Sequence, residues 1–101
     1  MSVYITHPTE SAAKKITSFL IERRVIACAN LFPITSAYWW KGVVQNDKEW
    51  VSIVKTTHER WEALEKAVVE VHPYDVPCII RTTVDANQAY EDWIRSCVDT
   101  D

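Results

Sequence analysis

The densest group of reactive side chains lies in residues 72–77, which read HPYDVP. An imidazole, a phenol and a carboxylate stand within four residues there, and two prolines restrict the backbone around them. A stiff loop of this kind could hold a small ligand. It could equally be structural, with His72 capping a helix, Asp75 making a local turn and Tyr74 filling the core.

Lys55 is the second candidate, because it lies near the end of a segment that is otherwise apolar. Its ammonium group either reaches solvent at the rim of the fold or meets an anion there. If the segments that carry Lys55, His72 and Tyr74 end at the same edge of a sheet, these residues would bind a small anionic ligand without any bond-making step. Asp75 would then orient Lys55 or His72, and a neighbouring chain would close the pocket.

Soft or borderline metal ligands are few and widely spaced. They are His7, His58, His72, Cys28, Cys78 and Cys97. None of their spacings is that of a structural zinc site, and a single cysteine in a strand is more often a small buried hydrophobe than a ligand. An odd number of widely spaced cysteines, with no export signal before them, predicts a reducing compartment and a cytoplasmic protein.

Composition and motifs argue against several other functions. The net charge is −3 and the basic residues are scattered, so the basic track of a nucleic-acid-binding protein is missing. No apolar run approaches the ~20 residues of a membrane-spanning helix. Neither a glycine-rich phosphate loop nor a nucleophile elbow is present, so we expect no enzymatic activity and no required cofactor.

The elements that must position these residues are organised around a long β-hairpin between residues 27 and 57, which contains the only glycine, Gly42. The outgoing arm, residues 27–40, is rich in β-branched and aromatic side chains. Pro33 cannot donate a backbone hydrogen bond, so it predicts an edge, a bulge or a change of partner in that arm. The return arm, residues 50–56, is apolar on both faces and should be covered on both.

Aromatic side chains gather near the far end of this hairpin: Tyr38, Trp39, Trp40 and Trp50. At the tip of a lone hairpin their rings would face water. Packing within the chain would explain one or two of them, whereas a partner surface explains the group better. A platform for nucleobases is the other interpretation, but the basic and aromatic motif of RNA-recognition sheets is missing.

Alternation and helical spacing predict the remaining elements: a strand over residues 1–7, a helix after Pro8, a helix that stops at Pro73, a strand over residues 78–84 and a last helix. Thr56 with Glu59, and Asp85 with Gln88, should cap the second and third helices. This order describes an α+β protein with a ferredoxin-like βαββαβ sandwich and an extra C-terminal helix, a single domain over residues 1–101. Assembly would cover the second face of its sheet.

Five segments in this order resemble the CutA family of divalent cation tolerance proteins. They read ACAN at residues 27–30, YWWKG at 38–42, VKT at 54–56, HPYDVP at 72–77 and YEDW at 90–93. The resemblance covers nearly the whole chain. It implies a tight homotrimer in which the long hairpins extend into neighbouring subunits, much as in the PII signalling proteins.

The same resemblance implies functional positions. Cys28 matches the strand cysteine of the family, while Lys55, His72, Tyr74 and Trp40 match positions that line clefts between subunits. Copper and other divalent ions are associated with the cysteines and histidines of the family.

Two positions depart from the family pattern. Cys78 stands where the family commonly has glutamate, and Trp39 stands where a polar residue is frequent. Both changes bear on which ion or ligand the cleft binds, and neither changes the predicted fold.

Two function classes follow. The first is a homotrimeric protein that binds or responds to divalent metal ions such as copper. Its predicted ligands are Cys28, Cys78 and His72. The second is a PII-like sensor or interaction module that binds a small anion between subunits. Its predicted binding residues are Lys55, His72, Tyr74, Asp75 and Trp40.

Overall fold

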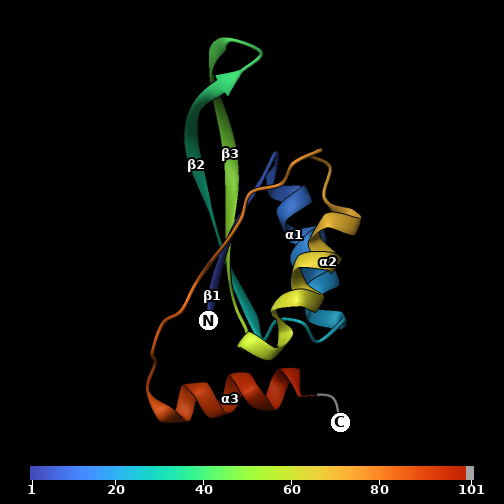
Figure 1. Cartoon of the computed structure of the whole chain (residues 1–101), viewed down its shortest axis with the longest axis vertical. Coiled ribbons are helices and arrows are strands. Elements are labelled where there is room, and N and C mark those ends of the chain that lie inside the picture. The colour runs from blue at the N-terminus through green and yellow to red at the C-terminus, as the bar shows by residue number, and fades with distance from the viewer. Residues whose placement is uncertain (100–101) are drawn as a thin grey trace.

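The computed structural model describes residues 1–99. Its elements are β1 (Ser2–His7), α1 (Glu10–Glu22), β2 (Cys28–Trp40), β3 (Val43–Lys55), the 3-10 turn η1 (His58–Arg60), α2 (Trp61–Val71), β4 (Ile79–Thr82) and α3 (Gln88–Val98). Within residues 1–99 the strands form one antiparallel sheet in the order β2-β3-β1-β4. Helices α1 and α2 pack beside each other against the sheet, and α3 lies at the end of the molecule opposite the hairpin tip (Figure 1). The predicted ferredoxin-like α+β fold with a long central hairpin and an extra C-terminal helix is confirmed.

The core lies between the sheet and the helices α1 and α2. Side chains of β1 alternate, so Val3, Ile5 and His7 point to one face, and none of them has exposed surface. Leu20 of α1 and Leu64 of α2 meet Val3 and Ile5 in the core cluster, and both are fully buried. A histidine therefore occupies a buried position at the end of an otherwise apolar strand face.

The hairpin of β2 and β3 projects beyond the body of the molecule (Figure 1). Its register runs without interruption to the pair of Trp40 and Val43, so the return arm begins at residue 43 rather than at residue 50 as predicted. Lys41 and Gly42 form the turn, with φ of 50° and 79°. A two-residue turn with positive φ at both positions matches the twist of the flanking strands, and glycine adopts it without strain.

Pro33 lies opposite Trp50, and β2 is an edge strand of the sheet. The edge alternative for Pro33 is therefore confirmed, whereas the register of β2 shows neither a bulge nor a second partner strand within residues 1–99. The return arm is covered on both faces, as predicted. Val51 and Ser52 point to opposite faces, and neither has exposed surface.

The predicted helix caps at Thr56 and Asp85 are wrong. The Thr56 hydroxyl donates to the Val25 carbonyl oxygen at 2.7 Å, and the chain makes η1 before α2 begins. Near α3 the Glu91 carboxylate accepts a hydrogen bond from the Ala86 amide at 3.0 Å. The Thr56 hydroxyl therefore bonds elsewhere than to the predicted backbone amide, and α3 begins after Asn87 rather than after Asp85.

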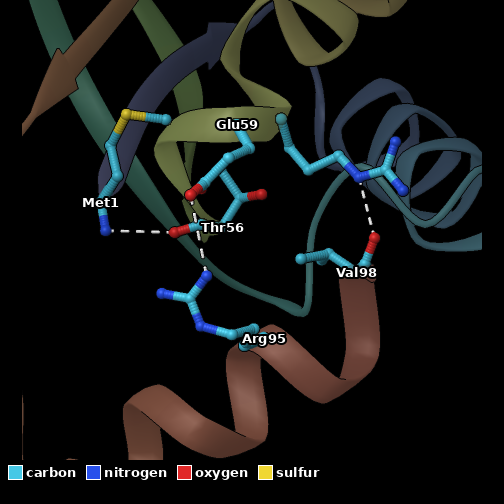
Figure 2. A network of polar contacts seen from close by, with 6 residues as sticks. Met1, Thr56, Glu59, Arg95 and Val98 are labelled. Carbon is cyan, nitrogen blue, oxygen red and sulfur yellow. Dashed lines mark hydrogen bonds and ion pairs between the residues drawn. The ribbon is translucent and has the colours of Figure 1, made fainter. Parts of the chain in front are cut away.

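Side chains around η1 hold α3 against the end of the sheet, as Figure 2 shows. Arg60 Nε donates to the Val98 carbonyl oxygen at 2.8 Å, which satisfies one of the last carbonyls of the helix. Arg95 reaches from α3 to Glu59, with 3.7 Å between the nitrogen and the carboxylate oxygen (Figure 2). No helix within residues 1–99 has both the length and the apolar character needed to cross a membrane.

Candidate functional site

The loop of residues 72–78 joins α2 to β4 and lies above the two packed helices (Figure 1). His72 follows the last residue of α2 and is 9% exposed. Its Nε2 lies 2.7 Å from the Thr6 carbonyl oxygen, and its Nδ1 lies 3.1 Å from the backbone nitrogen of Tyr74. The imidazole therefore ties the predicted site loop to β1.

His7 lies against His72 in the interior, with 5.5 Å between the centroids of their stacked rings. His7 Nε2 is 2.8 Å from Ser52 Oγ, while His7 Nδ1 has no hydrogen-bond partner within residues 1–99. The pKa of His7 falls from its ordinary 6.5 to about 4, chiefly because burial penalises the charged form and secondarily because His72 is close, although the Glu49 carboxylate opposes this. His7 is therefore neutral at pH 7.

Tyr74 connects the loop to β3. Its hydroxyl donates to Glu49 Oε2 at 2.6 Å, and its ring centroid is 4.8 Å from that of His72. Burial, followed by the hydrogen bond to Glu49, raises the pKa of Tyr74 and keeps the phenol protonated. Burial, followed by the charge of Glu49, also raises the pKa of the Cys78 thiol. These contacts join five residues into a loop cluster: His7, Glu49, Ser52, His72 and Tyr74.

Lys55 lies away from the loop cluster. It stands opposite Ser2 on β1, whereas His72 is bonded to Thr6, four residues further along the same strand. At ~3.3 Å per residue this is a separation of about 13 Å. The predicted meeting of Lys55 with His72 at one end of the sheet is wrong within one chain, because the two residues mark opposite ends of β1. Asp75 is exposed and makes no hydrogen bond or ion pair with any residue from 1 to 99, so it orients neither of them.

The predicted metal ligands are also separated. Cys28 stands opposite Lys55 at the start of β2, where its Sγ lies 3.2 Å from the Tyr90 hydroxyl. Cys78 and His72 belong to the other end of β1. In the part of the chain that the structure describes, no group of three or more His, Cys, Asp or Glu residues is arranged to hold a metal ion. A site that combines Cys28 with Cys78 and His72 would need more than one chain.

Trp40 lies at the tip of the hairpin and is 55% exposed. Lys41 Nζ is 5.7 Å from the centroid of its ring. Trp40 pairs with Val43, whereas Glu49 of the loop cluster lies six residues further along β3, or about 20 Å at ~3.3 Å per residue. Within one chain, Trp40 therefore cannot share a pocket with His72.

Ser52 and Glu49 were not predicted as members of the site, and His7 was predicted only as a loose metal candidate. A signal for His7 exists in the sequence, because it follows Val3 and Ile5 at the period of a strand and must face the core with them. No comparable signal marks Ser52 or Glu49. Their place depends on the register between β1 and β3, which sets Ser52 opposite Ile5.

Residues 1–97 match the family model described as CutA1 divalent ion tolerance protein. The chain belongs to this family. The divalent-cation tolerance protein CutA of Pyrococcus horikoshii is 45% identical to it over 93 residues, which cover 91% of each chain. The solved structure of CutA1 from Pyrococcus horikoshii has a TM-score of 0.95 at 42% identity and covers 98% of each chain. The apo structure of the PII-like protein CutA from a Nostoc species has a TM-score of 0.91 at 28% identity, covering 97% of this chain and 96% of that one.

In this CutA-family chain the loop cluster offers hydrogen bonding rather than an accessible reactive group. The contact between Ser52 Oγ and His7 Nε2 has the length of a nucleophile and its base. Both residues have no exposed surface, so a substrate could not reach the hydroxyl in this conformation. The hydrogen bonds of the loop cluster instead anchor the 72–78 loop to the sheet.

Proposed function

We propose that this CutA-family protein is a cytoplasmic homotrimer that binds or responds to divalent metal ions such as copper, without a catalytic step. The family match over residues 1–97 carries the proposal. The trimer is supported by the hairpin tip, where Trp39 and Trp40 are 74% and 55% exposed in a single chain. The cytoplasmic location is supported by the odd number and wide spacing of the cysteines.

The proposed metal ligands are the thiolates of Cys28 and Cys78, because soft sulfur ligands suit copper and zinc. The two residues lie toward opposite ends of β1 in one chain, so we propose that they come from different subunits. His72 completes the predicted set, but both of its ring nitrogens are hydrogen bonded.

Replacing Cys28 and Cys78 together by serine should weaken copper binding at least tenfold, measured by calorimetric titration of the purified protein. Because burial and Glu49 raise the pKa of the Cys78 thiol, coordination must release a proton, and wild-type affinity should increase as the pH rises above 7. Cys97→Ser is the matched control and should bind copper like the wild type. Unchanged affinity in the double variant would return both cysteines to the role of packing residues.

The second candidate function is a PII-like module that binds a small anion between subunits, with Lys55, Tyr74 and Trp40 around the ligand and His72 holding Tyr74 in place. One observation favours it. Lys55 Nζ donates to the side-chain oxygen of Asn30, a neutral acceptor, and no carboxylate within residues 1–99 is paired with it. Its charge is therefore available to an anionic ligand.

Lys55→Met should abolish the binding of carboxylates or nucleotides in a calorimetric panel and leave stability nearly unchanged, since methionine keeps much of the apolar stem. Lys48→Met removes a charge from the same strand, β3, and should leave anion binding intact. Loss of several kcal/mol of unfolding free energy in Lys55→Met, with no change in ligand binding, would instead make Lys55 a structural residue.

A further inference from the structure

Both ring nitrogens of His72 are already engaged. The Tyr74 backbone N–H can only donate, so Nδ1 of His72 at 3.1 Å is an unprotonated acceptor. The Thr6 carbonyl oxygen can only accept, so Nε2 at 2.7 Å carries the proton. The two bonds agree on one neutral tautomer. They leave no nitrogen lone pair free for a metal ion, which needs an unprotonated nitrogen.

His7 and Ser52 hold this imidazole from the interior. The His7 ring stacks on His72 with 5.5 Å between centroids, and the contact of 2.8 Å between His7 Nε2 and Ser52 Oγ favours this orientation of the His7 ring. Among residues 1–99 the arrangement leaves His7 Nδ1 buried without a hydrogen-bond partner, which is rare for a buried polar atom. An apolar residue would fill the same position without that cost, so the histidine calls for a role beyond packing.

The rest of the loop is fastened to β3 by the bond of 2.6 Å from the Tyr74 hydroxyl to Glu49. The loop is thus attached to β1 through Thr6 and to β3 through Glu49. In the middle of the same loop Val76 is 88% exposed. A short segment that keeps a large apolar side chain in solvent needs attachments at its base. His72 supplies the one to β1, and its bond to the Tyr74 amide orders the loop that carries the other.

We propose that His7, Ser52 and His72 form a lock that fixes the 72–78 loop on the sheet, and that His72 is a positioning residue for Tyr74 rather than a metal ligand. The lock is a property separate from the proposed metal binding. It removes His72 from the predicted set of metal ligands. A metal on His72 would have to displace either the Tyr74 amide or the Thr6 carbonyl. A metal-bound Cys28 thiolate could still accept a hydrogen bond from the Tyr90 hydroxyl, which lies 3.2 Å from its Sγ.

The lock is tested by nuclear magnetic resonance on the metal-free protein at pH 7.5. Long-range nitrogen-proton spectra should show His72 as the single tautomer protonated on Nε2. Ser52→Ala removes the hydroxyl that holds His7, and it should speed hydrogen exchange of the Tyr74 amide about tenfold. His58→Ala is the matched control, a histidine outside the loop cluster, and should leave that exchange rate unchanged. His7→Leu should act like Ser52→Ala, and the serine variant keeps the test valid if the leucine variant fails to fold.

Zinc chloride added to the wild-type protein provides a second readout, because zinc is diamagnetic and shifts the nitrogen signal of any histidine that it binds. We expect the His72 nitrogens and the Tyr74 amide to stay at their metal-free positions. A zinc-induced shift of a His72 nitrogen, a tautomer protonated on Nδ1, or unchanged Tyr74 exchange in the serine variant would each overturn the lock. Failure of copper binding in calorimetry would refute only the metal proposal, since the tautomer and the exchange rate are measured without metal.

Discussion

Replacing both Trp39 and Trp40 by glutamate should convert the proposed homotrimer into a species of one chain mass at micromolar concentration. The two rings are 74% and 55% exposed in a single chain. They stand beside Tyr38, Val43 and Val44, which are also exposed, on a hairpin that projects away from the core (Figure 1). Consecutive strand residues point to opposite faces, so the hairpin tip exposes apolar side chains on both faces, and exposed apolar surface of this extent marks an interface.

The expected effect is large because tryptophan contributes much apolar area. Each ring would bury roughly 150 Å² in an interface, which corresponds to about 3 to 4 kcal/mol at ~25 cal/mol per Å². Two rings per chain therefore amount to about 7 kcal/mol, or about five powers of ten in the association constant. Glutamate would also bring a charge that must lose its water on assembly.

Sedimentation equilibrium measures the result directly, and circular dichroism checks that the secondary structure is kept. Val69→Glu is the matched control, since Val69 is 57% exposed on α2, away from the tip, and its variant should stay near three chain masses. A double variant that still sediments near three chain masses would refute the role of the hairpin tip.

The order of elements was predictable because it rests on local patterns. β1 alternates with a period of two, and α2 ends before Pro73, which cannot continue a helix. The helix caps were not predictable in the same way. The Thr56 hydroxyl bonds to the Val25 carbonyl, which is 31 residues away, and a local capping motif cannot reveal such a partner.

The candidate site was predictable only in part. His72 and Tyr74 stood out by residue type and by the prolines around them. Their partners did not, because His7 bonds to Ser52 across 45 residues and Tyr74 bonds to Glu49 across 25. A one-residue shift of register would turn Ser52 away from the core, so this pairing belongs to the tertiary structure and not to any short segment.

The unfolding free energy should fall by about 2 to 3 kcal/mol between pH 7.5 and pH 4.5 through His7 alone. Its pKa is about 4 in the folded chain, because burial disfavours the imidazolium ion, and its ordinary value is 6.5. Between these two values the unfolded chain binds more protons than the folded one, so acid favours unfolding. The contribution of neutral His7 to the unfolding free energy is complete above pH 6.5. It is lost as the pH falls toward 4, at about 1.36 kcal/mol per pH unit.

Urea unfolding of the wild type and of His7→Gln at several pH values isolates this effect. The glutamine amide stays neutral throughout and can still donate to Ser52 Oγ, while the carboxylates that also titrate are shared by both proteins and cancel in the difference. The stability of the wild type relative to His7→Gln should therefore decrease by about 2 to 3 kcal/mol from pH 7.5 to pH 4.5. If the stability difference between the wild type and His7→Gln stays constant over this range, water reaches His7 in solution. The conclusion that His7 is a buried, neutral imidazole would then be wrong.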